Sequence, residues 1–148
     1  MTESKSWPAP DEAATATLAA TLAPRARAGD VILLSGPLGA GKTSFARAFI
    51  RARTNNPALD IPSPTFTLVQ TYEARGGDIW HYDLWRAASL TDLEELAWDE
   101  ARAGIVLVEW PDRLGPLAPP DALHITITLD PPGRGITLIG PARWFDAS

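Results

Sequence analysis

The sequence predicts a single α/β domain whose mixed sheet has a parallel centre and antiparallel hairpins. Two short, continuous apolar runs, Val31–Leu34 and Ile105–Val108, are typical of parallel strands that are buried on both faces. Segments with a helical pattern alternate with strand-like segments, which favours an α/β fold. Pairs of strand-like segments joined by short turns predict the hairpins. A length of 148 residues is typical of one domain with a buried core.

The N-terminal region predicts a tail followed by a helix. Residues 1–10 are polar and contain two prolines, so we expect a loose tail, with the domain itself spanning residues 11–148. Asp11 precedes an alanine-rich run over residues 12–23, which predicts a helix that Asp11 caps and Pro24 ends. The first buried strand follows this helix after a short turn.

The middle of the chain predicts a loop, a helix and a hairpin. Residues 36–41 form a glycine-punctuated loop, and residues 43–53 have the apolar spacing of a helix. Residues 54–64 contain prolines and Asn or Asp side chains, which are typical of a loop. Two strand-like segments, 66–72 and 79–84, are joined by so short a turn that they predict an antiparallel hairpin.

The C-terminal region predicts a helix, a strand, a connector and a second hairpin. Thr91 and Glu94 form a capping-box pattern that opens a helix to about Ala103. After the second buried strand, the proline-rich residues 111–120 predict a connector. Two further strand-like segments, 123–129 and 136–139, flank a Pro- and Gly-containing turn and predict a terminal hairpin.

Composition excludes several classes of protein. The net charge of −5 argues against a general nucleic-acid coat or a membrane-surface binder, because both need a basic face. The chain has no cysteine, which excludes disulfides, thiolate metal sites and cysteine nucleophiles. No apolar run approaches the ~20 residues of a membrane span, and the N-terminus lacks the apolar region of a secretory signal. We therefore expect a cytoplasmic protein without membrane association.

A phosphate-binding loop is the strongest motif. Residues 36–43 fit the pattern G-x-x-x-x-G-K-[ST], in which glycines let backbone amides turn towards phosphate oxygens. Lys42, one of only two lysines, would supply a charge to the phosphates, and the Thr43 hydroxyl would bind Mg²⁺. A plain glycine-rich turn is the alternative, but the preceding apolar strand and following helix are the context that phosphate binding requires. The predicted nucleotide-binding residues of this loop are Gly36, Leu38, Gly39, Ala40, Gly41, Lys42, Thr43 and Ser44.

A carboxylate at the end of the second buried strand predicts the magnesium-binding partner of this loop. Glu109 directly follows four apolar residues, as the acidic residue of a phosphoryl-transfer site does. The alternative is an exposed glutamate that merely ends a strand. Trp110 comes next, and the pattern leaves open whether it shields the site, stacks on a partner or belongs to the core.

Two further segments are candidates for the γ-phosphate end of the site. Residues 63–65, Ser-Pro-Thr, lie where small NTPases have a loop that responds to this phosphate, and Thr65 would reach Mg²⁺ through its hydroxyl. From the pattern alone, a rigid turn entering a strand is favoured there. His81 and Asp83 share one strand face, so Asp83 is a candidate to support Mg²⁺ or the attacking water, and His81 to hold Asp83. A structural polar pair explains this pattern equally well.

The base is predicted to be adenine. Ras-type GTPases read guanine with an Asn-Lys-x-Asp motif, and no lysine follows Lys42 in this chain. The chain therefore cannot carry that motif downstream of its phosphate loop.

Four motifs, together with Pro10-Asp11-Glu12 before the first helix, resemble the TsaE family, formerly YjeE, which are small bacterial P-loop ATPases of tRNA threonylcarbamoyladenosine synthesis. They occur in the family's order and spacing, and the resemblance extends over about residues 8–140. The motifs are Leu38-Gly-Ala-Gly-Lys-Thr43, Ser63-Pro-Thr-Phe-Thr-Leu-Val69, His81-Tyr-Asp-Leu-Trp-Arg86 and Val108-Glu-Trp-Pro111.

The resemblance implies a P-loop NTPase fold, ATP and ADP as nucleotides, Mg²⁺, and weak ATPase activity. It also implies a complex with TsaD and TsaB, which attach threonylcarbamoyl to adenosine 37 of tRNAs that read codons starting with A. ATP hydrolysis would reset this complex, and the tRNA would be contacted indirectly through the partners. The acidic charge of the chain fits that arrangement, since direct tRNA binding would call for a basic face.

The resemblance also implies roles for individual residues. Thr43 and Glu109 would be the magnesium residues, and Lys42 with the loop amides would hold phosphate. Thr65 would belong to the switch loop. The residues implied for turnover are Asp83 and Trp110, and those implied for the adenosine end of the nucleotide are Asp11 and Arg134.

Two other function classes remain open from the residues. A small-molecule P-loop kinase would need an acceptor pocket and an arginine-bearing lid, and residues 111–122 offer only Arg113 for the lid. A nucleotide-sensing interaction module without turnover is the other class. Pure binding would not need Glu109, Asp83 and Thr65, which argues against such a module.

Overall fold

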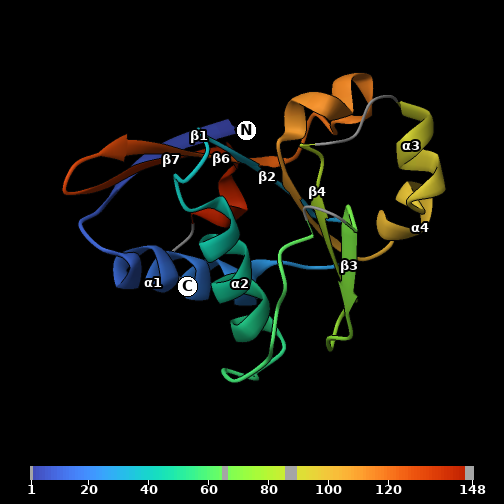
Figure 1. Ribbon diagram of the computed structural model, residues 1–148, viewed down its shortest axis with the longest axis horizontal. Coiled ribbons are helices and arrows are strands. Elements are labelled where there is room, and N and C mark those ends of the chain that lie inside the picture. The colour runs from blue at the N-terminus through green and yellow to red at the C-terminus, as the bar shows by residue number, and fades with distance from the viewer. Residues whose placement is uncertain (1, 65–66, 86–89, 146–148) are drawn as a thin grey trace.

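A computed structural model describes residues 2–64, 67–85 and 90–145 of the chain. In these ranges, seven strands form one mixed sheet in the spatial order β1-β7-β6-β2-β5-β4-β3 (Figure 1). The strands are β1 (Thr2–Ala9), β2 (Val31–Ser35), β3 (Val69–Tyr72), β4 (Ile79–Asp83), β5 (Ile105–Glu109), β6 (Leu123–Asp130) and β7 (Gly133–Pro141). The helices are α1 (Glu12–Leu22), α2 (Lys42–Arg53), α3 (Leu90–Glu95) and α4 (Trp98–Ala101), with 3₁₀ turns at Ala23–Arg25, Pro111–Leu117 and Ala142–Trp144.

The parallel centre consists of β4, β5, β2 and β6, because β2 pairs in parallel with both β5 and β6, and β4 pairs in parallel with β5. Antiparallel pairing joins β3 to β4 and β6 to β7, so both predicted hairpins are present. The start of the first hairpin expected at residue 66 lies outside the described residues. The predicted α/β class with a parallel centre is confirmed.

The N-terminal segment differs from the loose tail expected over residues 1–10. Residues 2–9 form β1, which pairs antiparallel with β7 from Thr2 opposite Pro141 to Ala9 opposite Arg134. Six of its eight residues are exposed, so the strand has no apolar stripe that a sequence pattern can reveal. Its order comes from the backbone hydrogen bonds to β7, and Pro8 is tolerated because β1 is an edge strand. The tail prediction is wrong for this segment.

The first two helices follow the sequence pattern, whereas the helix expected from Thr91 to about Ala103 is divided. Asp11 caps α1 by accepting a 2.9 Å hydrogen bond from the Ala14 amide. Between α3 and α4, Ala97 has left-handed backbone angles (φ 61°, ψ 39°), which end one helix and redirect the chain into the next. The side chains of residues 90–92, including the capping-box Thr91, lie outside the described part of the chain.

Two hydrophobic cores cover the two faces of the sheet, with α1 and α2 packed together on one face (Figure 1). The core on the opposite face includes residues of α3 and α4 and of the 3₁₀ turn at Pro111–Leu117. Tyr82 and Leu84 belong to this second core, so the alternating residues of β4, His81 and Asp83, share the other face of the sheet, as predicted. The first core includes Leu18, Leu22, Ile32, Phe45, Phe49, Leu107 and Trp144, and the second includes Val31, Tyr82, Leu84, Leu93, Trp98, Val106 and Leu114.

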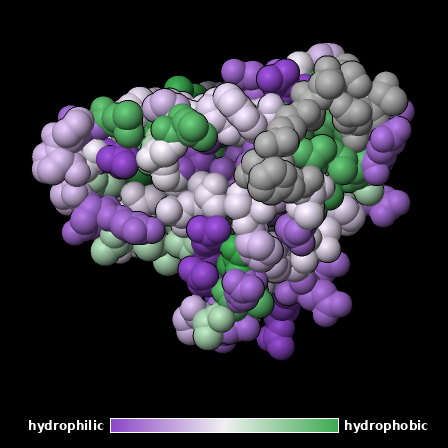
Figure 2. Space-filling view, viewed as in Figure 1, coloured by the Kyte–Doolittle hydropathy of each residue, from purple (hydrophilic) through white to green (hydrophobic). Residues whose placement is uncertain are grey.

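Polar and apolar side chains are interspersed on the face of the molecule that Figure 2 shows. Outside the grey atoms, the hydrophobic residues of this face form small patches separated by hydrophilic ones (Figure 2). Among the described helices, none has the length and apolar character that crossing a membrane requires.

Candidate phosphate-binding site

The glycine-rich loop connects the end of β2 to the start of α2. Gly36, Gly39 and Gly41 all have positive φ angles, of 148°, 80° and 110°. These angles turn the loop back on itself, and Gly41 forms the N-cap of α2, whose first residue is Lys42. The N-terminus of α2 therefore points its free amides into the loop, as an anion site requires.

Two features restrict position 36 to glycine: its positive φ angle and the close approach of a neighbouring strand. A Cβ atom at this position would lie 2.3 Å from the carbonyl oxygen of Ile127 in β6, whereas one at Gly39 would meet no atom within 4 Å. Both glycines have positive φ, but only Gly36 is crowded. A comparison of substitutions at the two positions therefore distinguishes the effect of crowding from that of backbone strain.

We expect Gly36→Ala to lower the free energy of unfolding by about 3 kcal/mol, because it adds a backbone clash to a strained φ. The matched variant Gly39→Ala should lose only about 1 kcal/mol, from φ alone. Urea unfolding followed by circular dichroism measures both values. Equal losses in the two variants would show that β6 does not hold the loop at Gly36.

Lys42 is folded back over the loop. Its Nζ donates hydrogen bonds to the carbonyl oxygens of Gly36 (2.6 Å) and Pro37 (3.0 Å) and lies 3.9 Å from the ring centroid of Trp110. Burial lowers the pKa of Lys42 below its ordinary value, while the nearby carboxylates of Glu109 and Asp83 act in the opposite direction. The ammonium group is thus held at the centre of the loop.

A chain of hydrogen bonds connects α2 to two central strands. The Thr43 hydroxyl donates to Oε1 of Glu109 at 2.7 Å, and Nε2 of His81 lies 2.6 Å from Oε2 of the same carboxylate. Glu109 is 2% exposed and His81 is completely buried. The glutamate expected at the end of a buried strand is therefore directed into the site and is not exposed to solvent. His81, considered from the sequence as support for Asp83, instead contacts Glu109.

Asp83 lies beside Glu109 at the carboxyl edge of the sheet. The two residues are opposite each other in the parallel pairing of β4 and β5, and Asp83 is 4% exposed. One of its carboxylate oxygens, Oδ1, accepts a 3.0 Å hydrogen bond from the amide of Trp85. The indole rings of Trp85 and Trp110 are 4.4 Å apart at their centroids, and Trp85 remains 45% exposed. Trp110 thus packs on a hydrophobic core and also covers Lys42.

A pocket of about 260 Å³ contains the residues expected at the phosphate end. Among the described residues, no group of three or more His, Asp or Glu side chains is arranged to hold a metal by itself. Mg²⁺ in nucleotide sites takes one or two carboxylates together with phosphate oxygens, so the hydroxyl of Thr43 next to the Glu109 carboxylate fits this ion. The pocket is lined by Leu38, Gly39, Gly41, Lys42, Thr43, Ser44, Asp83, Glu109 and Trp110.

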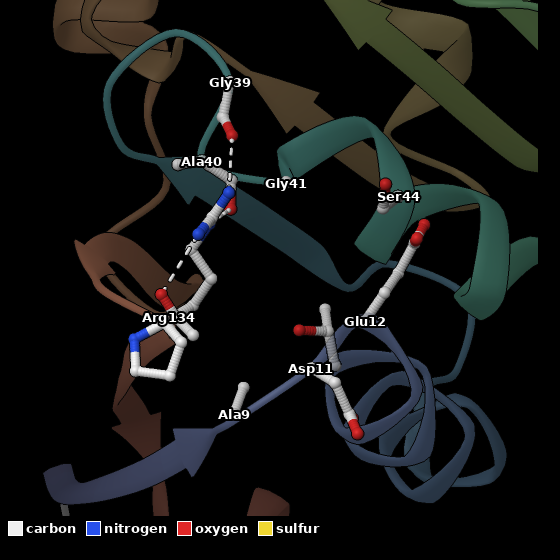
Figure 3. A pocket seen from close by; sticks show the side chains of 11 residues that line it. Ala9, Asp11, Glu12, Gly39, Ala40, Gly41, Ser44 and Arg134 are labelled. Atoms are coloured by element: carbon white, nitrogen blue, oxygen red, sulfur yellow. Dashed lines mark hydrogen bonds between the residues drawn. The ribbon is translucent and has the colours of Figure 1, made fainter.

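A second pocket, of about 270 Å³, adjoins the other side of the loop and shares Gly39, Gly41 and Ser44 with the first (Figure 3). Arg134 reaches into it from β7, and Asp11 and Glu12 lie across from it at the start of α1 (Figure 3). Its complete lining is Ala9, Asp11, Glu12, Thr15, Gly39, Ala40, Gly41, Ser44, Pro132, Gly133 and Arg134.

Arg134 also holds the loop backbone. Its Nε donates to the carbonyl oxygen of Ala40 (3.0 Å) and its Nη2 to that of Gly39 (3.2 Å) (Figure 3). Asp11 and Arg134, expected from the resemblance at one end of the nucleotide, therefore line the same pocket. The contact of Arg134 with the loop itself had no signal in the sequence, because it joins residues that are far apart in the chain.

The Ser63–Pro64–Thr65 segment lies partly outside the described residues. Thr65 lies outside the described residues, so its predicted role stays a prediction. The preceding segment is held to α2 by two arginines, since Arg47 Nε donates to the Ile61 carbonyl (2.8 Å) and Arg51 Nε to that of Leu59 (3.0 Å). Sequence reasoning missed these anchors; their spacing of four residues along α2 was the available signal.

Comparison with known proteins finds a matching family and relatives that carry the same name. Residues 9–135 match the family described as "Threonylcarbamoyl adenosine biosynthesis protein TsaE". The chain is 39% identical over 117 residues to the tRNA threonylcarbamoyladenosine biosynthesis protein TsaE of Rickettsia conorii, covering 78% of this chain and 66% of the relative. It is 33% identical over 123 residues to the protein of the same name from Bacillus subtilis, covering 82% of this chain and 75% of the relative.

A solved structure agrees with these sequence matches. The crystal structure of Bacillus subtilis YdiB superimposes with a TM-score of 0.78 and 28% sequence identity, covering 98% of this chain and 91% of YdiB. The chain spans about two thirds of the length of the Rickettsia conorii relative and nearly all of the YdiB structure. Fold, family profile and sequence identity agree, and the chain therefore belongs to the TsaE family of threonylcarbamoyl adenosine biosynthesis proteins.

Proposed function

We propose that this protein is a Mg²⁺-dependent ATPase that serves the threonylcarbamoylation of adenosine 37 in tRNAs reading codons that start with A. It would act with TsaD and TsaB, and its ATP hydrolysis would reset their complex between rounds. The observation that carries the ATPase proposal is the 2.7 Å hydrogen bond between Thr43 and Glu109 at the foot of the loop that holds Lys42. These are the three side chains that a phosphoryl-transfer site needs at those positions.

The loop would hold the phosphates through fixed backbone dipoles. The amides at the start of α2 and the turn made by Gly39 and Gly41 present donors to an anion without a rearrangement of the helix. Lys42 would exchange its contacts with the loop carbonyls for contacts with the terminal phosphate oxygens. Its charge would then oppose the charge that develops in the transition state.

Thr43 and Glu109 would hold Mg²⁺. When bound, the ion supplies positive charge that neutralises the phosphate oxygens. Glu109 is almost completely buried and is held by hydrogen bonds on both of its oxygens, so it loses little conformational freedom when it binds the ion. Asp83, at the same edge of the sheet, is the group that would accept a hydrogen bond from the attacking water.

The pocket beside Arg134 would take the adenosine end of the nucleotide. It adjoins the phosphate pocket through shared loop residues and is lined by Asp11 and Arg134, the two residues that the family resemblance implies there. Arg134 would act mainly through the loop, because its guanidinium binds two loop carbonyls.

The partner proposal depends on family membership and charge. The chain has a net charge of −5, so the negatively charged tRNA would be held by TsaD and TsaB and not by this protein. Trp110 lines the phosphate pocket, where it would report the state of the nucleotide to a docked partner, and the segment around Ser63 would serve as the second element of this switch.

A phosphate-release assay tests the proposed ATPase. With Mg²⁺, the isolated protein is expected to release phosphate from ATP over multiple turnovers, slowly, and to prefer ATP to GTP. Transfer of the phosphate to a metabolite mixture in place of water would support a small-molecule kinase instead. Binding of ATP without multiple-turnover release would support a nucleotide-sensing module and contradict the proposal.

A further inference from the structure

We propose that His81 is a positioning residue that fixes the rotation of the Glu109 carboxylate towards Thr43. The inference rests on the proposed function, because it assigns the residue that orients a magnesium-binding group. Nε2 of His81 lies 2.6 Å from Oε2 of Glu109, and the other oxygen of that carboxylate, Oε1, accepts the Thr43 hydrogen bond at 2.7 Å. Within the described part of the chain, each oxygen of Glu109 therefore has one hydrogen-bond partner, and the two together fix the plane of the carboxylate.

The protonated nitrogen of His81 follows from its surroundings. The side chain is completely buried on β4, and its Nδ1 has no hydrogen-bond partner among the described residues. A buried N–H without an acceptor is more unfavourable than a bare ring nitrogen that lacks a donor. The ring hydrogen is therefore assigned to Nε2, which makes His81 a donor to Glu109.

The ammonium group of Lys42 competes with His81 for the same carboxylate. Lys42 is close enough to Glu109 and Asp83 to interact with both charges. Without the hydrogen bond from His81, Oε2 of Glu109 would be free to rotate towards Lys42, and the oxygen that faces Thr43 would lose its orientation. His81 keeps the Glu109 carboxylate oriented towards Thr43, while Lys42 remains hydrogen-bonded to the loop carbonyls. Groups that orient a metal ligand in this way typically change metal affinity or activity by about 10- to 100-fold.

The test compares two amide substitutions of different length. The amide nitrogen of His81→Gln can reach the position of Nε2, whereas that of His81→Asn is too short to do so. Binding of Mn²⁺ to the protein in the presence of ADP is measured by electron paramagnetic resonance, and ATP hydrolysis by single-turnover phosphate release. We expect His81→Asn to lose about 10- to 100-fold in Mn²⁺ affinity and in hydrolysis, and His81→Gln to stay within about threefold of the parent in both.

Two controls separate positioning from a general loss of stability. Tyr82→Phe removes a hydrogen bond from the opposite face of β4, the one that the Tyr82 hydroxyl donates to the Leu96 carbonyl, and should leave Mn²⁺ affinity unchanged. In a Glu109→Gln background, His81→Asn should cause no further loss, because His81 acts through the missing carboxylate. ADP affinity without metal, measured by calorimetry, should be similar in all His81 variants.

Equal Mn²⁺ affinity of the Gln and Asn variants, or a further loss in the Glu109→Gln background, would overturn the assignment of His81. Failure of the proposed function is a different result. In that case the parent protein itself would show neither Mn²⁺ binding with ADP nor phosphate release, whatever residue stands at position 81.

Discussion

Lys42→Ala is expected to reduce ATP hydrolysis by about 10²- to 10³-fold, the usual loss when one preorganised electrostatic group is removed from a reacting centre. Lys42 is the ammonium group that the phosphate pocket contains, and its Nζ is held within hydrogen-bonding distance of two loop carbonyls. Its removal would also take away a positive charge that interacts with the carboxylates of Glu109 and Asp83, so ATP affinity should fall together with turnover. Single-turnover hydrolysis and calorimetry measure the two effects.

The chain provides a matched control for this prediction. Lys5, the other lysine, lies in β1 with its Nζ 5.8 Å from the ring centroid of Trp7, and Lys5→Ala should hydrolyse ATP at the parent rate. Glu109→Ala should differ from Lys42→Ala by preserving ADP binding better than hydrolysis. Parent-like hydrolysis by Lys42→Ala would show that the loop is not the phosphate site.

The parts of the site that could be predicted from sequence are local in the chain. The loop, the start of α2 and the strand before it are consecutive, and glycine spacing with one lysine is enough to identify them. Glu109 could be predicted as well, because a carboxylate that follows a buried strand lies at the carboxyl edge of the sheet. The parallel centre of the sheet was predictable from two apolar runs, because parallel strands are buried on both faces and therefore have continuous apolar sequences.

What sequence reasoning missed depends on pairing between distant segments. The contact of His81 with Glu109 requires that β4 pair in parallel with β5, in the register that puts Asp83 opposite Glu109. A single sequence gives no information on that register, and a shift of one residue would turn His81 to the other face. Arg134 reaches the loop only because β7 returns beside β6, which itself lies beside β2.

Two local errors have different physical causes. The sequence predicts a tail in place of β1 because an exposed edge strand needs no apolar face when its backbone is paired. The capping box at Thr91 and Glu94 predicts one continuous helix to about Ala103. In the structure Ala97 is left-handed, and the turn directs Trp98 into the core against Tyr82, with ring centroids 5.4 Å apart. Tertiary packing thus overrides the intrinsic propensity of one residue.

The second large effect is expected in a reconstituted system of this protein, TsaD, TsaB, tRNA and the threonylcarbamoyl donor. We expect the parent protein to support many rounds of tRNA modification per complex. Glu109→Ala, Asp83→Ala and Trp110→Ala should each bind ATP and stop near one round. Glu109 and Asp83 act on the metal and water in the proposed mechanism. Trp110 covers Lys42 and packs against Trp85, which is exposed enough to meet a partner.

The number of tRNA-modification rounds per complex distinguishes a role in ATP turnover from a role in assembling the complex. If the protein only holds TsaD and TsaB together, a variant that binds ATP without hydrolysing it should assemble the complex and sustain as many rounds as the parent. If hydrolysis resets the complex, the same variant should give about one modified tRNA per complex, and fresh parent protein should restart the reaction. Lys5→Ala serves as the control for handling and folding, because Lys5 lines neither pocket of the site. Sustained modification by Glu109→Ala would replace the ATPase role with an assembly role.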